Sequence, residues 1–170
     1  IGKQDECAAV YGGLNIFKYT KEKVTVKPIK LNNATFREFQ KNSLLFRIGN
    51  RKHSANILQK QIKNIYKSKI KTLNALHTAK NLALEMRDAL RNNNLEKFNE
   101  VLNEGWKVKK QFATGISSSR IEKISKEAMN HGAQSLKVTG AGGGGHMFVY
   151  ATTRKHKSIE RIMKKLGAEK

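Results

Sequence analysis

The fold is decided by Lys137-Val138-Thr139-Gly140-Ala141-Gly142-Gly143-Gly144-Gly145-His146-Met147-Phe148-Val149-Tyr150, in which five of the six residues 140–145 are glycine. Leu136 and Val138 alternate with polar residues before the glycines, and an apolar run follows them. Glycine inside a strand costs backbone entropy and packs nothing. The run therefore predicts a loop between two strands that a ligand or another backbone approaches closely. Phosphate suits such a loop, because bare N–H groups can converge on its oxygens; the alternative is a plain glycine-rich hairpin or a flexible loop.

The glycine run differs from the two best-known nucleotide loops. It lacks the Gly-Lys-Ser/Thr ending of a P-loop, and no helical pattern opens directly after it. It also lacks the strand–glycine–helix order of a dinucleotide site. The run alone therefore leaves phosphate contact and a structural hairpin as equal alternatives.

Composition narrows the class of protein. The chain has 170 residues, one cysteine and a net charge of +21 from 34 basic and 13 acidic residues. Such a charge suggests nucleic acid or phosphorylated ligands as partners. The lysines are scattered over several segments, however, and AT-rich codons explain much of the excess, so we expect no specific nucleic-acid partner. A single cysteine excludes an internal disulfide and fits a reducing compartment. No apolar run approaches the length of a membrane span, and we expect no membrane partner and a cytoplasmic location.

Apolar periodicity predicts the order of secondary structure. A short helix over 5–13 is followed by strands at 14–19, 24–29 and 44–48, and by helices whose apolar faces span 55–65, 76–90, 95–112 and 121–129. The serines 117–119 can cap the last of these helices. Two strands then flank the glycine run, and a final helix shows apolar residues over 159–166. This order predicts an α+β fold in which helices pack on one face of a mainly antiparallel sheet.

Two stretches together resemble the GHMP small-molecule kinases. One is Gly2-Lys3-Gln4-Asp5-Glu6-Cys7-Ala8-Ala9-Val10-Tyr11-Gly12-Gly13-Leu14-Asn15, and the other runs from Gly132 through the glycine run to Gly145. Segments 44–51 and 103–110 support the match, which follows the same order along essentially the whole chain. The sugar kinase branch that includes heptose 7-phosphate kinases is the most similar.

The resemblance implies a site and a domain division. It implies ATP-dependent phosphoryl transfer to a hydroxyl of a sugar or sugar phosphate, with Mg²⁺ and ATP as cofactors. Asp5 matches the family's catalytic carboxylate, and the loop that shapes the site beside the phosphates matches Gly140, Ala141, Gly142, Gly143, Gly144 and Gly145. The resemblance also assigns residues 1–40 to the tail end of the N-terminal catalytic domain and residues 41–170 to a ferredoxin-like C-terminal domain.

Three further residues are candidates for substrate binding. Arg51 follows a strand end, where its planar guanidinium could hold a phosphate or stay in solvent. Lys137 points away from Leu136 and Val138 and borders the glycine run, so it could reach phosphate or lie in water. Thr139 could likewise contact a phosphate or lie in water. No residue is assigned as a metal ligand.

The chain departs from the family in two respects. Glu6 stands where many sugar kinases have Gln, which leaves the sugar open. The family's second glycine-rich motif, which wraps the ATP phosphates, is absent from the sequence. We therefore expect the chain to be the carboxy-terminal part of a kinase, to need an N-terminal half as partner, and not to turn over ATP alone. The alternatives are a non-catalytic binding module of the same fold and, on charge alone, a nucleic-acid binder. The apolar surface on which the N-terminal half would pack could instead be covered in a homodimer.

Overall fold

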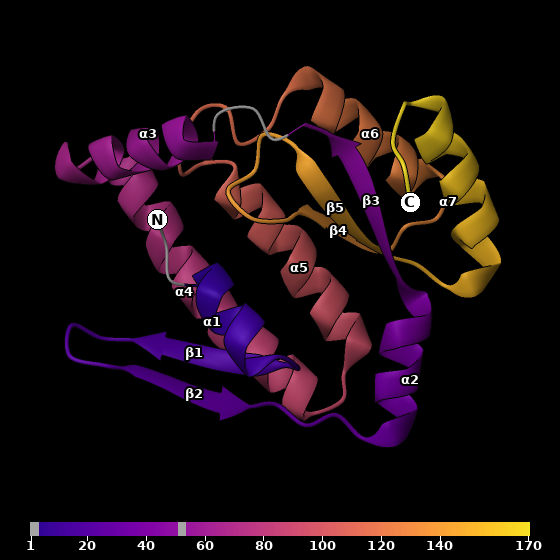
Figure 1. Cartoon of the computed structure of the whole chain (residues 1–170), viewed down its shortest axis with the longest axis horizontal. Helices are drawn as coiled ribbons and strands as arrows, with labels where there is room; N and C mark the ends of the chain where they lie inside the picture. Colours follow the sequence, from indigo (N-terminus) through magenta and orange to yellow (C-terminus); the bar gives the residue numbers. More distant parts are fainter. Residues whose placement is uncertain (1–3, 51–53) are drawn as a thin grey trace.

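The structure, a computed structural model, describes residues 4–50 and 54–170 (Figure 1). The elements follow in the order α1 (Gln4–Tyr11), β1 (Asn15–Tyr19), β2 (Val24–Pro28), α2 (Asn33–Asn42), β3 (Ser43–Gly49), α3 (Ser54–Tyr66), α4 (Ile70–Arg91), α5 (Leu95–Lys109), α6 (Ser119–Asn130), β4 (Ser135–Val138), β5 (Gly145–Tyr150) and α7 (Thr153–Lys165). The predicted α+β class with an antiparallel sheet is confirmed. Helices pack on both faces of the three-stranded sheet, not on one as expected, because the aromatic side chains of β5 form a second apolar face.

The centre of the molecule is a three-stranded antiparallel sheet in the order β3-β5-β4. Its register places Leu44 and Leu136 on either side of Val149, and Phe46 and Val138 on either side of Met147. Because side chains alternate along a strand, these residues share one face, and α6 and α7 cover that face (Figure 1). The apolar alternation read from the sequence is thus the inner face of the sheet.

Both edges of this sheet are covered. Asn103 on α5 accepts a hydrogen bond from the Leu136 amide at 3.3 Å and donates to the Gln134 carbonyl at 2.8 Å, at the edge of β4. The backbone of Glu169 pairs with Arg47 at the edge of β3, with its amide donating to the Arg47 carbonyl at 2.9 Å. At these positions the backbone groups of the edge strands are already hydrogen-bonded.

The other face of the sheet carries an aromatic cluster. Phe98 packs edge-on against Phe39, Phe148 and Tyr150, with ring centroids 5.3–6.4 Å apart. The hydroxyl of Tyr150 accepts a hydrogen bond from the Asn42 side chain at 3.2 Å. This cluster joins α2 and α5 to the sheet, and it is what fixes α2, a helix that the sequence analysis did not predict.

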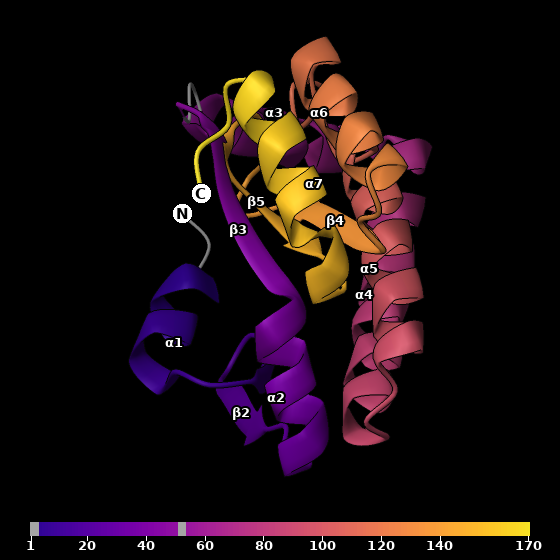
Figure 2. The ribbon, with the colours of Figure 1, turned by 90° about the vertical axis from the view of Figure 1, so that its right-hand side faces the viewer.

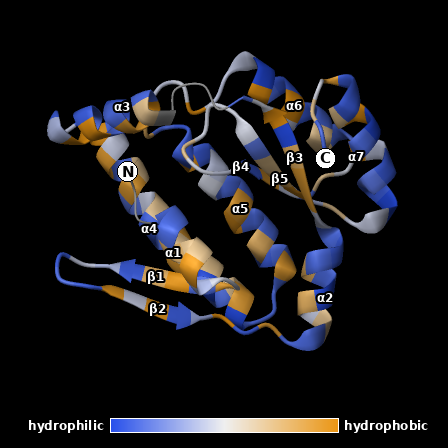
Figure 3. Cartoon of the chain, viewed as in Figure 1, coloured by the Kyte–Doolittle hydropathy of each residue, from blue (hydrophilic) through white to orange (hydrophobic). Residues whose placement is uncertain are grey.

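The first elements pack beside the long antiparallel pair of α4 and α5. Helix α1 lies beside the hairpin of β1 and β2 (Figures 1 and 2). The Tyr11 ring of α1 packs edge-on against Phe17 of β1, with ring centroids 6.0 Å apart. Figure 3 shows hydrophobic residues on α1, α3 and α4, and Val10, Tyr66 and Ile70 are among those exposed, at 80%, 85% and 75%. None of the helices that the structure describes is long and apolar enough to cross a membrane.

Candidate active site

The glycine-rich loop connects β4 to β5 as a hairpin. The Thr139 amide and hydroxyl both donate to the His146 carbonyl, at 2.9 and 3.2 Å, which closes the loop at its base. Gly140 and the four glycines Gly142–Gly145 have positive φ angles, between 61° and 143°. Backbone in this region strongly favours glycine, so the composition of the loop follows from its path.

Two of these glycines lie directly against another segment of the chain. The Gly143 amide donates to the Ile116 carbonyl at 2.8 Å. A Cβ at Gly142 would lie 2.8 Å from that same carbonyl oxygen, and a Cβ at Gly143 would lie 2.7 Å from Ile57. The close approach predicted from the sequence is therefore, at these positions, an approach of the chain's own backbone. It leaves the Gly143 amide occupied.

Lys109, the last residue of α5, binds the loop from the other side. Its ammonium donates to the Gly140 carbonyl and, at 3.4 Å, to the Val138 carbonyl. The sequence analysis did not assign it to the site, since 31 positions separate it from Gly140. It is a functional candidate that only the packing of α5 beside β4 identifies.

Lys137 points away from the core, as its alternation with Leu136 and Val138 predicts. It lies half-buried at the end of a groove of about 260 Å³ between α4 and α5, which also includes Lys109. The other lining residues are Ala79, Leu82, Ala83, Met86, Val101, Leu102, Gly105 and Phe112. Burial in this apolar groove lowers the pKa of Lys137 below its ordinary value, because the charged form has lost water. The groove therefore offers a poorly solvated ammonium beside the glycine-rich loop.

Asp5 lies in the first turn of α1 and is exposed. An acidic residue there is stabilised by the helix dipole. The end of α1 that carries it is directed toward the half of the molecule with the glycine-rich loop (Figures 1 and 2). No hydrogen bond or ion pair within the described residues joins the two. Arg51 lies outside the residues that the structure describes, and those residues contain no group of three metal-ligating side chains.

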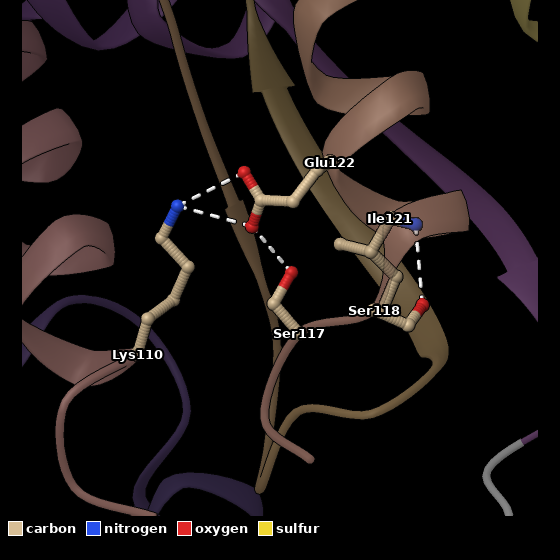
Figure 4. A network of polar contacts seen from close by, with 5 residues as sticks. All are labelled: Lys110, Ser117, Ser118, Ile121 and Glu122. Carbon is tan, nitrogen blue, oxygen red and sulfur yellow. Dashed lines mark hydrogen bonds and ion pairs between the residues drawn. The ribbon is translucent and has the colours of Figure 1, made fainter. Parts of the chain in front are cut away.

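A polar network holds the segment between α5 and α6 (Figure 4). Glu122 accepts hydrogen bonds from the Lys110 ammonium at 3.0 and 3.1 Å and from the Ser117 hydroxyl at 2.5 Å. Ser118 caps α6 by accepting from the Ile121 amide at 3.3 Å. Of the three serines that the sequence offered as caps, Ser118 takes that role and Ser117 binds Glu122.

Comparison with known proteins identifies the class. Residues 86–169 match the family model described as GHMP kinases C terminal. A curated D-glycero-alpha-D-manno-heptose 7-phosphate kinase of Campylobacter jejuni is 32% identical over 173 residues, which cover 98% of this chain and 49% of that protein.

Solved structures agree on the fold. A putative sugar kinase from Campylobacter jejuni superimposes with a TM-score of 0.68 at 28% identity, covering 99% of this chain and 47% of that one. The mevalonate kinase of L. major in complex with R-mevalonate has a TM-score of 0.76 at 21% identity, covering 95% of this chain and 47% of that one. The chain thus spans about half the length of these relatives.

The fold and the glycine-rich loop therefore resemble those of the C-terminal half of GHMP kinases. Residues 86–169 form a C-terminal domain of the GHMP kinase family.

Proposed function

We propose that the protein containing this chain transfers the γ-phosphoryl group of ATP to a hydroxyl of a sugar phosphate of the heptose 7-phosphate type. The observation that carries the proposal is the 32% identity to a heptose 7-phosphate kinase across 98% of the chain. The rigidly backed glycine-rich loop supports it. Positioning and electrostatic stabilisation are what such a transfer requires of a protein.

Asp5 is the proposed catalytic residue. An exposed carboxylate can orient the attacking hydroxyl and accept its proton at a carboxylate oxygen. The loop Gly140–Gly145 is proposed to lie beside the phosphates, and its amides other than that of Gly143 are the donors we assign to them. Thr139, Arg51 and Lys137 remain proposed substrate contacts.

Mg²⁺ is proposed to accompany ATP. The described residues hold no three-ligand cluster, and Mg²⁺ in kinases usually needs one or two carboxylates besides phosphate and water. Glu6, which lies beside Asp5 in the first turn of α1, offers such a carboxylate. When bound, the ion neutralises charge on the transferring phosphoryl group.

The division of the chain is also part of the proposal. Residues 1–40 are assigned to the catalytic domain and residues 41–170 to the C-terminal domain. The exposed apolar residues of α1, Val10 and Tyr11, are the surface that we assign to the N-terminal half of the kinase. Alternatively, a second copy of the chain covers this apolar surface in a homodimer. We also propose a cytoplasmic location.

Lys137→Met should raise the melting temperature by about 2–4 °C, because it removes a poorly solvated charge from an apolar groove. The same change should raise the KM for the sugar phosphate about tenfold, the worth of roughly one charged hydrogen bond. Thermal melts and initial rates measure the two effects. Lys123→Met, at an exposed position of α6, is the matched control. A lowered melting temperature with an unchanged KM would show that Lys137 has a structural role.

An acceptor panel separates a kinase from a non-catalytic module. ADP release by the intact protein should depend on a heptose 7-phosphate and be weaker with a heptose 1-phosphate or mevalonate. Sugar phosphate binding without ADP release would favour the non-catalytic module. Tight duplex binding at near-physiological salt would favour the nucleic-acid alternative.

A further inference from the structure

The network around Glu122 ties a loop to a helix. Glu122 is in the first turn of α6 and binds Ser117, which precedes that helix, and Lys110, which follows α5. The segment between α5 and α6 is therefore held at both of its ends by one carboxylate (Figure 4).

The held segment is the one that backs the glycine-rich loop. Ile116, next to Ser117, is 1% exposed and belongs to the core. Its carbonyl oxygen accepts a hydrogen bond from the Gly143 amide and would lie only 2.8 Å from a Cβ at Gly142. A shift of Ser117 is passed to Ile116 and, through this carbonyl, to the loop. Cores are densely packed and transmit strain, so small displacements are not absorbed on the way.

The ionised form of Glu122 favours its hydrogen bonds with Ser117 and Lys110. Its partial burial opposes ionisation, but the Ser117 hydroxyl and the Lys110 ammonium outweigh it, and the pKa of Glu122 lies below its usual value. The carboxylate is thus ionised at neutral pH. With side chains 31% and 49% exposed, the Lys110–Glu122 pair contributes little to global stability. What the network offers instead is a fixed position for Ser117.

We propose that Glu122 and Ser117 are positioning residues, which hold the Gly115–Ser117 segment so that the glycine-rich loop keeps the geometry needed for phosphoryl transfer. The proposal rests on the proposed kinase function for its kinetic part only. Its physical part, the coupling of Glu122 to the glycine-rich loop, stands on the contacts alone.

The test compares Glu122→Gln, Ser117→Ala and the double variant of the intact protein with wild type. Hydrogen exchange over residues 140–145, read by mass spectrometry, should accelerate in all three variants. The value of kcat/KM should fall about tenfold to a hundredfold, as a misplaced site predicts. Because the two residues act through one network, the double variant should lose no more than the worse single one.

Controls make the outcome decisive. Ser117→Thr keeps the hydroxyl and should restore slow exchange and activity. Glu127→Gln removes a carboxylate from the same helix, beside His131, and should change neither reading. Faster exchange in a protein that transfers no phosphate would support the coupling and contradict the kinase function. Unchanged exchange over residues 140–145 in an active enzyme would overturn the proposal.

Discussion

Replacing Asp5 by Asn in the intact enzyme should lower kcat by about 10²–10⁴-fold, the usual contribution of a general base. Asn has nearly the same shape, but it carries no charge and cannot accept the proton. The Asp5 side chain is exposed, and no hydrogen bond or ion pair joins it to another side chain among the described residues. Only its favourable position at the helix N-terminus is lost, so the melting temperature should change little. Steady-state turnover with a heptose phosphate and a thermal melt are the two measurements.

Asp88→Asn is the matched control. Asp88 is an exposed aspartate of α4 that pairs with the neighbouring Arg87 at 2.7 Å, and its replacement should leave turnover intact. Wild-type turnover in Asp5→Asn would exclude this carboxylate from catalysis.

Gly142→Ala should destabilise the protein by about 1–3 kcal/mol and reduce activity about a hundredfold. The φ angle of Gly142 is 94°, where an L side chain is strained, and the new Cβ would lie 2.8 Å from the Ile116 carbonyl oxygen. That neighbour is backbone and cannot rotate away. Chemical denaturation and initial rates measure the two losses.

Gly105→Ala is the control for Gly142→Ala, because the structure has room for a methyl group at position 105. Gly105 lies inside α5, and a Cβ there would meet nothing within 4 Å. Alanine should stabilise this helix by about 0.5–1 kcal/mol. Equal stability losses at Gly105 and Gly142 would contradict the role given to the loop geometry.

The central sheet could be predicted from the sequence because its signals are local. Alternation at Leu136 and Val138, and the apolar run from Met147, mark strands whose inner residues are buried as expected. The predicted apolar faces 76–90 and 121–129 end within one residue of the ends of α4 at Arg91 and α6 at Asn130. In these segments, apolar periodicity and helix-terminating residues predict the structure without information from distant residues.

Other parts depend on contacts between distant residues. Helix α2 has few apolar residues and forms against Phe98 and Tyr150, far along the chain. Lys109 looks like one more surface lysine in the sequence, and Glu122 like an ordinary first-turn acid. Their roles follow from tertiary packing, which no local pattern records. For the same reason the sequence could name the glycine-rich loop but not the Ile116 carbonyl behind it.

The central claim is that this chain is part of an enzyme that phosphorylates a sugar phosphate. Phosphorus-31 NMR of the intact protein with Mg²⁺, ATP and a heptose 7-phosphate tests it directly. We expect the γ-phosphate signal of ATP to decrease as ADP and a second phosphate ester signal on the heptose appear together, and we expect Asp5→Asn to stop this transfer. Loss of the γ-phosphate to inorganic phosphate alone, or no change with any sugar phosphate, would contradict it.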